Sequence, residues 1–367
     1  MILNLNKSCK ELLNLFSPIF NYNNNILNNI SGIEFSGGII TQASLIPELD
    51  STLKKKAYIQ SVHASTAIDG NILTLDDVSK LLNGSDDDDK GKNEVRDYGY
   101  VLKNLDKYHD NGRVTEDLLL DMHREITKNV SVDTLHGGKY RDVGINVKDM
   151  DTNRVRFIPP SNIHVPRLMD DLISWINNSN EISPILVAGI VHYEFLRIHP
   201  FMGGNGKTAR ALTTLILYIR GYDTKGYLTL DECYNNDINA YLNALKTADD
   251  TFDLTHWLEY FTESFLLSVT KVKTEVLRLL TISPLPNELD KQLILKDNQI
   301  KIINYIQEFG QITNKETKMI LEISSQASHN NLKKLQKMKI ITRKGSGRST
   351  FYVLNRVNEK LRKQLIK

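Results

Sequence analysis

Cysteine is scarce in this sequence, and long apolar runs are absent from it. The 367 residues include only two cysteines, Cys9 and Cys233, which lie far apart and form no CxxC pair. This scarcity argues against a disulfide framework or a zinc site and favours a reducing, cytoplasmic compartment. No run of about 18 apolar residues predicts a membrane span. The first residues, MILNLNKSCKELLNLF, show neither the apolar region nor the cleavage site of a signal peptide.

Net charge is also small, at +2, but it is unevenly distributed. Residues 300–367 contain fifteen Lys or Arg against four Asp or Glu, a net of +11, so the rest of the chain carries a net of −9. This imbalance predicts a mildly acidic body with a basic C-terminal module. Nucleic acid is one partner that such a module suits.

Apolar residues recur at intervals of three and four along most of the chain, as is typical of helices. Helices are expected over residues 44–68, 114–130, 165–178, 183–198, 207–219 and 253–280. The segment 183–198 is apolar almost all round, which predicts a buried central helix. His123, Trp175 and Trp257 are interpreted as packing residues on these helices.

Three stretches depart from the helical pattern. Alternating apolar residues near 143–147 and 154–158 predict the two strands of a β-hairpin. The run SDDDDKGKNE, residues 85–94, is interpreted as a solvated acidic loop. Pro-rich residues 282–290 predict a linker. The fold class is therefore mainly α, with a hairpin on a helical body.

The basic C-terminal module has the pattern of a small α+β winged helix. One helix ends near Gly310, a second starts after Thr313, a third begins near Ser325, and strands at 340–345 and 349–354 flank a Gly-Ser-Gly-Arg wing. Residues expected at the exposed start of the third helix are Ser325, Gln326, Ser328, His329 and Asn331. Cations expected near DNA phosphates are Lys333, Lys334, Arg343, Lys344 and Arg348. Protein contact or dimerisation remains an alternative role, since many winged helices serve it.

Residues 198–212, IHPFMGGNGKTARAL, combine a histidine with a glycine-rich turn before an apolar helix. The GNGKT at their centre is not a Walker A loop, because Phe201 stands where its first glycine is required and no strand precedes it. Three glycines let the backbone approach a ligand closely. The following helix would present its N-terminal amides to an anion. Asn205, Lys207 and Arg210 add donors, and His199 can act as a base beside a bound phosphate.

At these residues the sequence resembles the Fic family, whose loop reads H-P-F-x-[D/E]-G-N-G-R-x-x-R. The matching positions are His199, Pro200, Phe201, Gly204, Asn205, Gly206 and Arg210. The resemblance covers roughly residues 114–248 and implies a helical core with a hairpin flap. It also implies an enzyme that transfers AMP from ATP to a Ser, Thr or Tyr hydroxyl of a protein, including itself.

The resemblance also implies roles for individual residues. His199, Asn205 and Arg210 would be catalytic, with His199 as the base and Phe201 locking the loop into the core. The nucleotide would be bound by Gly203, Gly204, Asn205, Gly206, Lys207, Arg210 and Tyr241. A target chain would add as a strand to a flap whose docking residues are Arg141, Val143, Ile145, Phe157 and Ile158.

Two positions depart from the family pattern. Gly203 replaces the acid that holds Mg²⁺ on the phosphates, and Lys207 replaces an arginine. Mg²⁺ would then rest on the nucleotide and water alone, and no metal-ligating residue is assigned. Two alternatives to transfer follow: a nucleotide-sensing regulator that binds DNA, or an enzyme that removes AMP from proteins.

Upstream, the stretch SVHASTAIDGN is similar to the family's inhibitory motif at Ser65, Asp69 and Gly70, with Asp in place of Glu. The resemblance implies that Asp69 pairs with Arg210 and denies it to the γ-phosphate. An ordinary helix C-cap at Gly70 is the alternative interpretation. The family resemblance also makes a homodimer an expected partner.

The expected domains are an N-terminal helical region at 1–110 with the inhibitory helix at about 44–71, a catalytic core at 111–280, a linker at 281–297 and a winged helix-turn-helix domain at 298–367. A zinc site at His192 and His199 is disfavoured, because the two lie seven residues apart and a compact helical site wants four. His192 is interpreted as a core histidine with a hydrogen bond.

Overall fold

A computed structural model describes residues 16–84, 90–129, 137–148, 153–282, 297–337, 340–345, 347 and 350–354. The chain divides into two compact units. The first comprises Met1–Gln42 and Leu53–Lys273, and the second comprises Ala43–Thr52 and Thr274–Lys367. The domain boundaries expected from the sequence remain a prediction.

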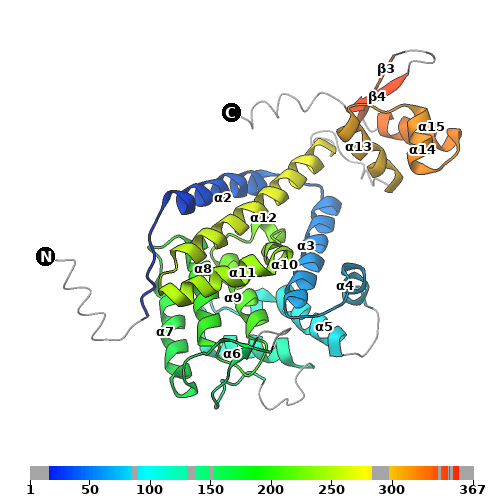
Figure 1. Cartoon of the computed structure of the whole chain (residues 1–367). Helices are drawn as coiled ribbons and strands as arrows, with labels where there is room; N and C mark the ends of the chain where they lie inside the picture. Colours follow the sequence, from blue (N-terminus) through cyan, green and yellow to red (C-terminus); the bar gives the residue numbers. More distant parts are fainter. Residues whose placement is uncertain are drawn as a thin grey trace. The chain divides into compact units, whose positions relative to one another are not determined.

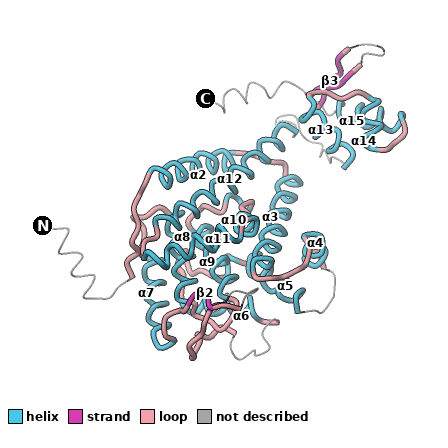
Figure 2. Tube along the Cα trace, viewed as in Figure 1, coloured by secondary structure: helices cyan, strands magenta, loops and turns pink. Residues whose placement is uncertain are grey.

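Helices build the body of the chain, as the sequence predicts (Figures 1 and 2). In chain order they are α2 (Asn24–Gln42), α3 (Pro47–Ile68), α4 (Leu75–Leu82), α5 (Lys90–Lys103), α6 (Glu116–Thr127), α7 (Val165–Asn178), α8 (Pro184–Ile198), α9 (Asn205–Ile219), α10 (Leu230–Asn236), α11 (Ile238–Thr251) and α12 (Thr255–Ile282). Short 3₁₀ turns lie at Leu105–Lys107, Asn162–His164 and Thr224–Gly226. Within the described residues, no helix is both long and apolar enough to span a membrane.

Helix α8 is the buried centre of the first unit, which confirms the prediction from its composition. Every side chain from Ile185 to Phe195 is buried. Ser183 occupies the expected N-cap position, although its side chain makes no capping hydrogen bond. Trp257 of α12 is fully buried and donates its indole N–H to the Gly189 carbonyl at 2.8 Å. Such close approach needs a glycine, because a β-carbon there would lie 2.9 Å from the Phe261 ring.

The hairpin is present but shorter than expected. Its strands are β1 (Val147–Lys148) and β2 (Val155–Phe157), paired antiparallel, and its turn at 149–152 lies outside the described residues. The expected strand at 143–147 is therefore wrong for all but its last residue. The carbonyls of Asp142 and Val143 accept hydrogen bonds from side chains, those of Asn162 and Arg141, instead of a strand partner.

The acidic loop expected at 85–94 is also only partly correct. Residues 90–94 form the first turns of α5, while 85–89 lie outside the described residues. Val95, Tyr98 and Val101 of α5 are fully buried, so this helix packs into the unit instead of standing in solvent. It contacts α4, α6 and α9.

The second unit has the order of elements that the sequence predicts. Besides the start of α3 and the end of α12, its elements are α13 (Asp297–Phe309), α14 (Asn314–Leu321), α15 (Ser325–Lys337), β3 (Ile341–Lys344) and β4 (Phe351–Leu354). A capping box at Thr313 and Glu316 starts α14. The strands pair antiparallel over a core of isoleucines and leucines. Of the linker expected at 281–297, residues 281–282 end α12 and residue 297 begins α13, while 283–296 lie outside the described residues, as does Arg348 of the expected wing.

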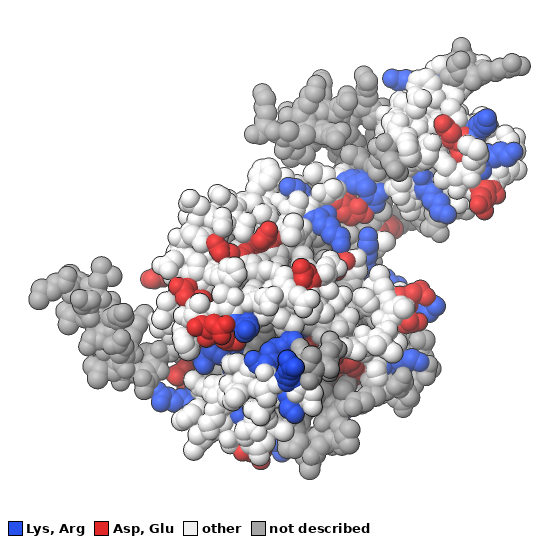
Figure 3. All heavy atoms as spheres, viewed as in Figure 1, with Lys and Arg blue, Asp and Glu red and all other residues white. Residues whose placement is uncertain are grey.

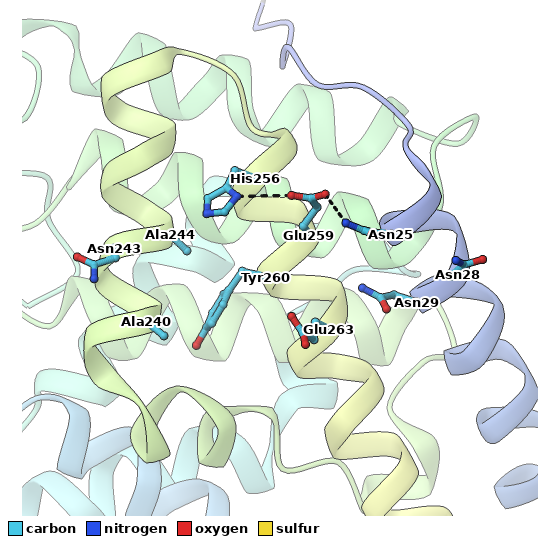
Figure 4. A pocket seen from close by; sticks show the side chains of 10 residues that line it. All are labelled: Asn25, Asn28, Asn29, Ala240, Asn243, Ala244, His256, Glu259, Tyr260 and Glu263. Carbon is cyan, nitrogen blue, oxygen red and sulfur yellow. Dashed lines mark hydrogen bonds and ion pairs between the residues drawn. The ribbon is translucent and has the colours of Figure 1, made fainter.

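A polar hollow of about 620 Å³ lies among α2, α11 and α12 (Figure 4). It is lined by Asn25, Asn28, Asn29, Ala240, Asn243, Ala244, His256, Glu259, Tyr260 and Glu263. Glu259 accepts hydrogen bonds from the side chains of Asn23 and Asn25, and His256 lies 3.5 Å away. The carboxylate is thus already partnered, and the hollow includes none of the loop residues 199–204.

Candidate active site

His199 ends α8 in the left-handed conformation, with φ 50° and ψ 61°. Its Nδ1 lies 3.1 Å from the Leu196 carbonyl oxygen. A carbonyl only accepts hydrogen bonds, so Nδ1 carries the ring proton and Nε2 is left as the basic nitrogen. Burial lowers the pKa of His199 to about 4, and nearby Arg141 contributes in the same direction. The imidazole is therefore neutral at pH 7, which is the form that accepts a proton.

Phe201 anchors the loop in the core, as the resemblance implies. It is fully buried and stacks on the ring of His123, with centroids 3.6 Å apart. His123 also lies 3.0 Å from the Gly203 carbonyl through Nε2 and 3.0 Å from the Gly138 amide through Nδ1. The interpretation of His123 as a packing residue was incomplete, because its ring also holds the loop by hydrogen bonds.

Asn205 has a structural role beside the phosphate-donor role that was expected, which stays a prediction. Its Oδ1 accepts from the Phe201 amide at 3.0 Å, and its Nδ2 donates to the Phe201 carbonyl at 2.9 Å. The side chain is almost completely buried. The side chain of Asn205 thus closes the turn of the loop.

Arg141 is not a docking residue of the flap, because its side chain is buried. Its guanidinium donates to the backbone carbonyls of His199 at 2.8 Å and Pro160 at 2.5 Å, and its amide donates to the Pro200 carbonyl at 2.9 Å. Arg141 therefore fixes the base of the flap to the loop. Of the other docking candidates, Val143 and Ile158 are exposed, while Ile145 and Phe157 are half-buried.

The N-terminus of α9 offers an anion site. Gly204 occupies the N-cap position with φ 72°, and no side chain caps the helix. The first amide groups of a helix have no partner within it, so those of Asn205, Gly206 and Lys207 are available to a ligand. A β-carbon at Gly203 would meet no heavy atom within 4 Å.

Arg210 makes the contacts that the inhibitory motif implies. Its Nε donates to the Ser65 hydroxyl at 2.6 Å, and its Nη2 lies 2.9 Å from Asp69 Oδ1. Gly70, with φ 91°, forms the turn that ends α3 just after Asp69. The helix C-cap at Gly70 and the Asp69–Arg210 ion pair are therefore both present, because the turn at Gly70 leaves Asp69 against α9.

Lys207 forms two ion pairs, which the sequence pattern does not predict. Its ammonium lies 2.9 Å from Asp69 Oδ2 and 2.6 Å from Glu94 Oε1. The side chain of Glu94 is only 15% exposed, so the assignment of this residue to a solvated loop is wrong. The apolar spacing of Val95, Tyr98 and Val101 was the signal that could have placed it on a packed helix.

Asp69 and Lys207 stabilise each other's charged forms. Burial alone would raise the pKa of Asp69, but Arg210 and Lys207 outweigh it, and the pKa is lowered. Burial likewise opposes the charge of Lys207, yet Asp69 and Glu94 raise its pKa. Gly206 makes this approach possible, because a β-carbon there would lie 2.9 Å from Asp69 Oδ1.

Tyr241 lies in the core, and its assignment to the nucleotide site stays a prediction. Its hydroxyl lies 2.8 Å from Nε2 of His192, which is fully buried and also contacts the Thr213 hydroxyl. His192 is thus the hydrogen-bonded core histidine that was predicted. Among the described residues, no group of three His, Cys, Asp or Glu side chains is placed to hold a metal ion.

Residues 113–217, which include the loop, the flap and helices α6 to α9, match the model of the Fic/DOC family. This segment of the chain is thus similar to Fic domains. It is 29% identical over 191 residues to protein adenylyltransferase Fic of Drosophila grimshawi and 30% identical over 181 residues to protein adenylyltransferase fic-1 of Caenorhabditis elegans. These matches cover 49% and 46% of this chain but only 37% and 34% of the relatives, so the chain matches little more than a third of either relative.

Solved Fic structures share the fold. A Fic family protein from Desulfovibrio desulfuricans G20 superposes with a TM-score of 0.64 at 24% identity, over 93% of this chain and 98% of that one. Fic-1 from C. elegans gives a TM-score of 0.54 at 21% identity, over 69% and 73%. The mainly α architecture expected from the sequence is confirmed.

Three buried histidines should make the fold sensitive to acid. Burial lowers the pKa values of His123 and His199 to about 4 and that of His192 to about 3. The unfolded chain takes up these protons near pH 6.5 and the folded chain does not, so stability is lost as pH falls from about 6.5 towards 4. We expect His123 and His192 each to cost about 3 kcal/mol by pH 4, measured by urea unfolding at several pH values.

The control for this experiment is His192→Gln, which can hydrogen-bond but does not titrate. Its unfolding free energy should depend less steeply on pH than that of the wild type, whatever its absolute stability. Equal slopes in the two proteins would contradict a neutral, buried His192.

Proposed function

We propose that this protein transfers AMP from ATP to a Ser, Thr or Tyr hydroxyl of a protein. The observation that carries the proposal is the placement of His199, whose basic Nε2 stands at the entrance of a loop that leads to the open N-terminus of α9. The relatives named protein adenylyltransferase support the same reaction.

In the proposed reaction, the amides at the start of α9 hold the phosphates of ATP, and Arg210 binds the γ-phosphate. The target hydroxyl attacks the α-phosphorus, and its proton passes to Nε2 of His199. The bond from the α-phosphorus to the bridging oxygen of the β-phosphate breaks, so pyrophosphate leaves. A neutral His199 is what this step needs, and burial keeps it neutral.

The target chain would dock on the flap. Val143, Val155, Ile158 and Ile163 expose large apolar side chains on and beside the hairpin. A short two-stranded pair leaves backbone groups at its edge for strand addition. Arg141 supports this surface from below by fixing it to the loop.

Asp69 would restrain the reaction. Arg210 is buried and its guanidinium is already bound to Ser65 and Asp69, so a γ-phosphate cannot use it until Asp69 withdraws. The side chain of Asp69 is 23% exposed and sits at the end of α3, where a small displacement of the helix end would release it.

Removing the brake and the base should have opposite effects on labelling. With α-labelled ATP and Mg²⁺ or Mn²⁺, we expect Asp69→Ala to raise self-labelling about tenfold or more, because Arg210 becomes free for phosphate. In the Asp69→Ala background, His199→Ala should lower labelling by about 10²–10⁴-fold, the usual contribution of a general base. If no variant becomes labelled and no lysate protein does, with ATP, GTP or UTP as donor, the enzyme proposal is wrong.

Gly203 decides how well the site uses a metal ion. The position has room for a side chain and a backbone that is not left-handed, so an aspartate fits there without strain. Mg²⁺ normally takes one or two protein carboxylates. In the Asp69→Ala background we therefore expect Gly203→Asp to raise labelling about tenfold and to lower the Mg²⁺ concentration needed for half-maximal labelling.

Gly203→Asn is the matched control, since it adds the same bulk without the charge. If both substitutions leave labelling unchanged while ATP still binds, the hypothesis of a nucleotide-sensing role is favoured over transfer.

We further propose that the second unit is a winged helix that contacts DNA. Ser325, Gln326 and His329 are exposed at the start of α15, while Lys333 and Lys334 are exposed further along it (Figure 3 shows Lys and Arg on this unit's surface). Ser328 cannot read a base, because it is buried and bonded to Asn314. Arg343 and Lys344 are exposed on β3, at the side expected for phosphates.

DNA binding by this unit should depend on salt. We expect Lys333→Gln with Lys334→Gln to weaken binding of duplex DNA and to reduce the slope of log affinity against log salt by about two. Lys315→Gln with Lys318→Gln removes the same charge from α14 and should change the slope less. Absence of salt-dependent binding in the wild type would favour a protein partner for this unit.

A further inference from the structure

Lys207 and Arg210 form the cationic side of the anion site, and both are neutralised by carboxylates. In the part of the chain that the structure describes, Arg210 forms an ion pair with Asp69, and Lys207 forms ion pairs with both Asp69 and Glu94. The side chains of Lys207 and Arg210 are 7% and 2% exposed, so water screens these pairs little. Two carboxylates therefore balance two cations at the N-terminus of α9.

The two carboxylates come from different elements. Asp69 follows the end of α3, and Glu94 lies in the second turn of α5, a helix that packs on α6 and α9. Withdrawal of the end of α3 would therefore free Arg210 but leave Lys207 bound to Glu94. A phosphate arriving at α9 would then meet one available cation and one that is still neutralised.

Glu94 is held in place independently of Lys207. Asn71 donates from its side chain to Glu94 Oε2 at 2.8 Å and to the Gly91 carbonyl at 2.8 Å. The backbone N–H of Asn71 donates to the Thr66 carbonyl near the end of α3. Asn71 thus connects the turn that carries Asp69 with the carboxylate of Glu94.

We propose that Glu94 is a second brake on the nucleotide site, which neutralises Lys207 after Asp69 has released Arg210. The inference rests on the proposed function, because it assumes that the N-terminus of α9 receives the phosphates of ATP. Full access for a nucleotide then requires two events: Asp69 leaves Arg210, and the carboxylate of Glu94 separates from Lys207. Asn71 holds Glu94 Oε2, so a displacement confined to the Asp69 side chain leaves Glu94 beside Lys207.

The test measures binding of ATP by calorimetry, in a His199→Ala background so that no turnover occurs. Four proteins are compared: this parent, Asp69→Asn, Glu94→Gln and the double variant. Glutamine keeps the shape of Glu94 and its acceptor for Asn71 but removes the charge. We expect each single variant to bind ATP about tenfold more tightly than the parent and the double variant to bind more tightly than either.

The matched control is Asp76→Asn, which removes an exposed carboxylate paired with Lys80 on α4. Its affinity for ATP should equal that of the parent. An equal gain in this control would mean that net charge alone is measured, and the second brake would be rejected. Glu94→Ala serves as a second variant, with thermal unfolding of each protein to show that it folds.

The outcomes separate the inference from the function on which it rests. If Asp69→Asn tightens binding and Glu94→Gln does not, or weakens it, the second brake is wrong and the proposed function stands. If no variant binds ATP, both are wrong. Tighter binding in both single variants, with a further gain in the double variant, supports the inference.

Discussion

The buried contact of Asp69 with Lys207 and Arg210 is the constraint on which the state of this site depends. Removing one partner from a buried ion pair costs about 3–5 kcal/mol, because it leaves the other charge buried and uncompensated. Three elements, α3, α5 and α9, meet at this contact and share its charges. Their positions are therefore linked, and any ligand that takes Arg210 must also provide for the carboxylate that it displaces.

The loop itself is held by ring stacking and by hydrogen bonds. Phe201 is fixed by the ring of His123 from one side and by the side chain of Asn205 along its backbone, while Arg141 holds the carbonyls of the preceding turn. None of these four side chains is free to bind phosphate. They set the shape of the loop so that backbone amides and one imidazole nitrogen are left for chemistry. Structural and catalytic groups are thus divided within a few residues.

Much of the helical fold and part of the candidate site could be predicted from the sequence. Helix positions followed from apolar spacing, the loop from a short motif, and the Asp69–Arg210 pair from the resemblance of one helix end. The partners of Glu94 and His123 could not be predicted in the same way, because they lie far away in the sequence and a local pattern can place a residue on a helix but cannot name its distant contacts. Asn205 and Arg141 were assigned to ligands because a motif names residue types but does not show which donors the backbone has already taken.

Gly206 has a consequence for the way inhibition would operate. Because it lacks a β-carbon, the carboxylate of Asp69 sits against the first turn of α9, where the proposed function would place a nucleotide phosphate. Asp69 is then a tethered competitor, and its strength is an effective concentration fixed by the rigidity of the end of α3. Occupancy of such a site depends on the nucleotide concentration relative to the effective concentration of Asp69. An event that loosens the end of α3 would therefore lower the nucleotide concentration at which the site fills.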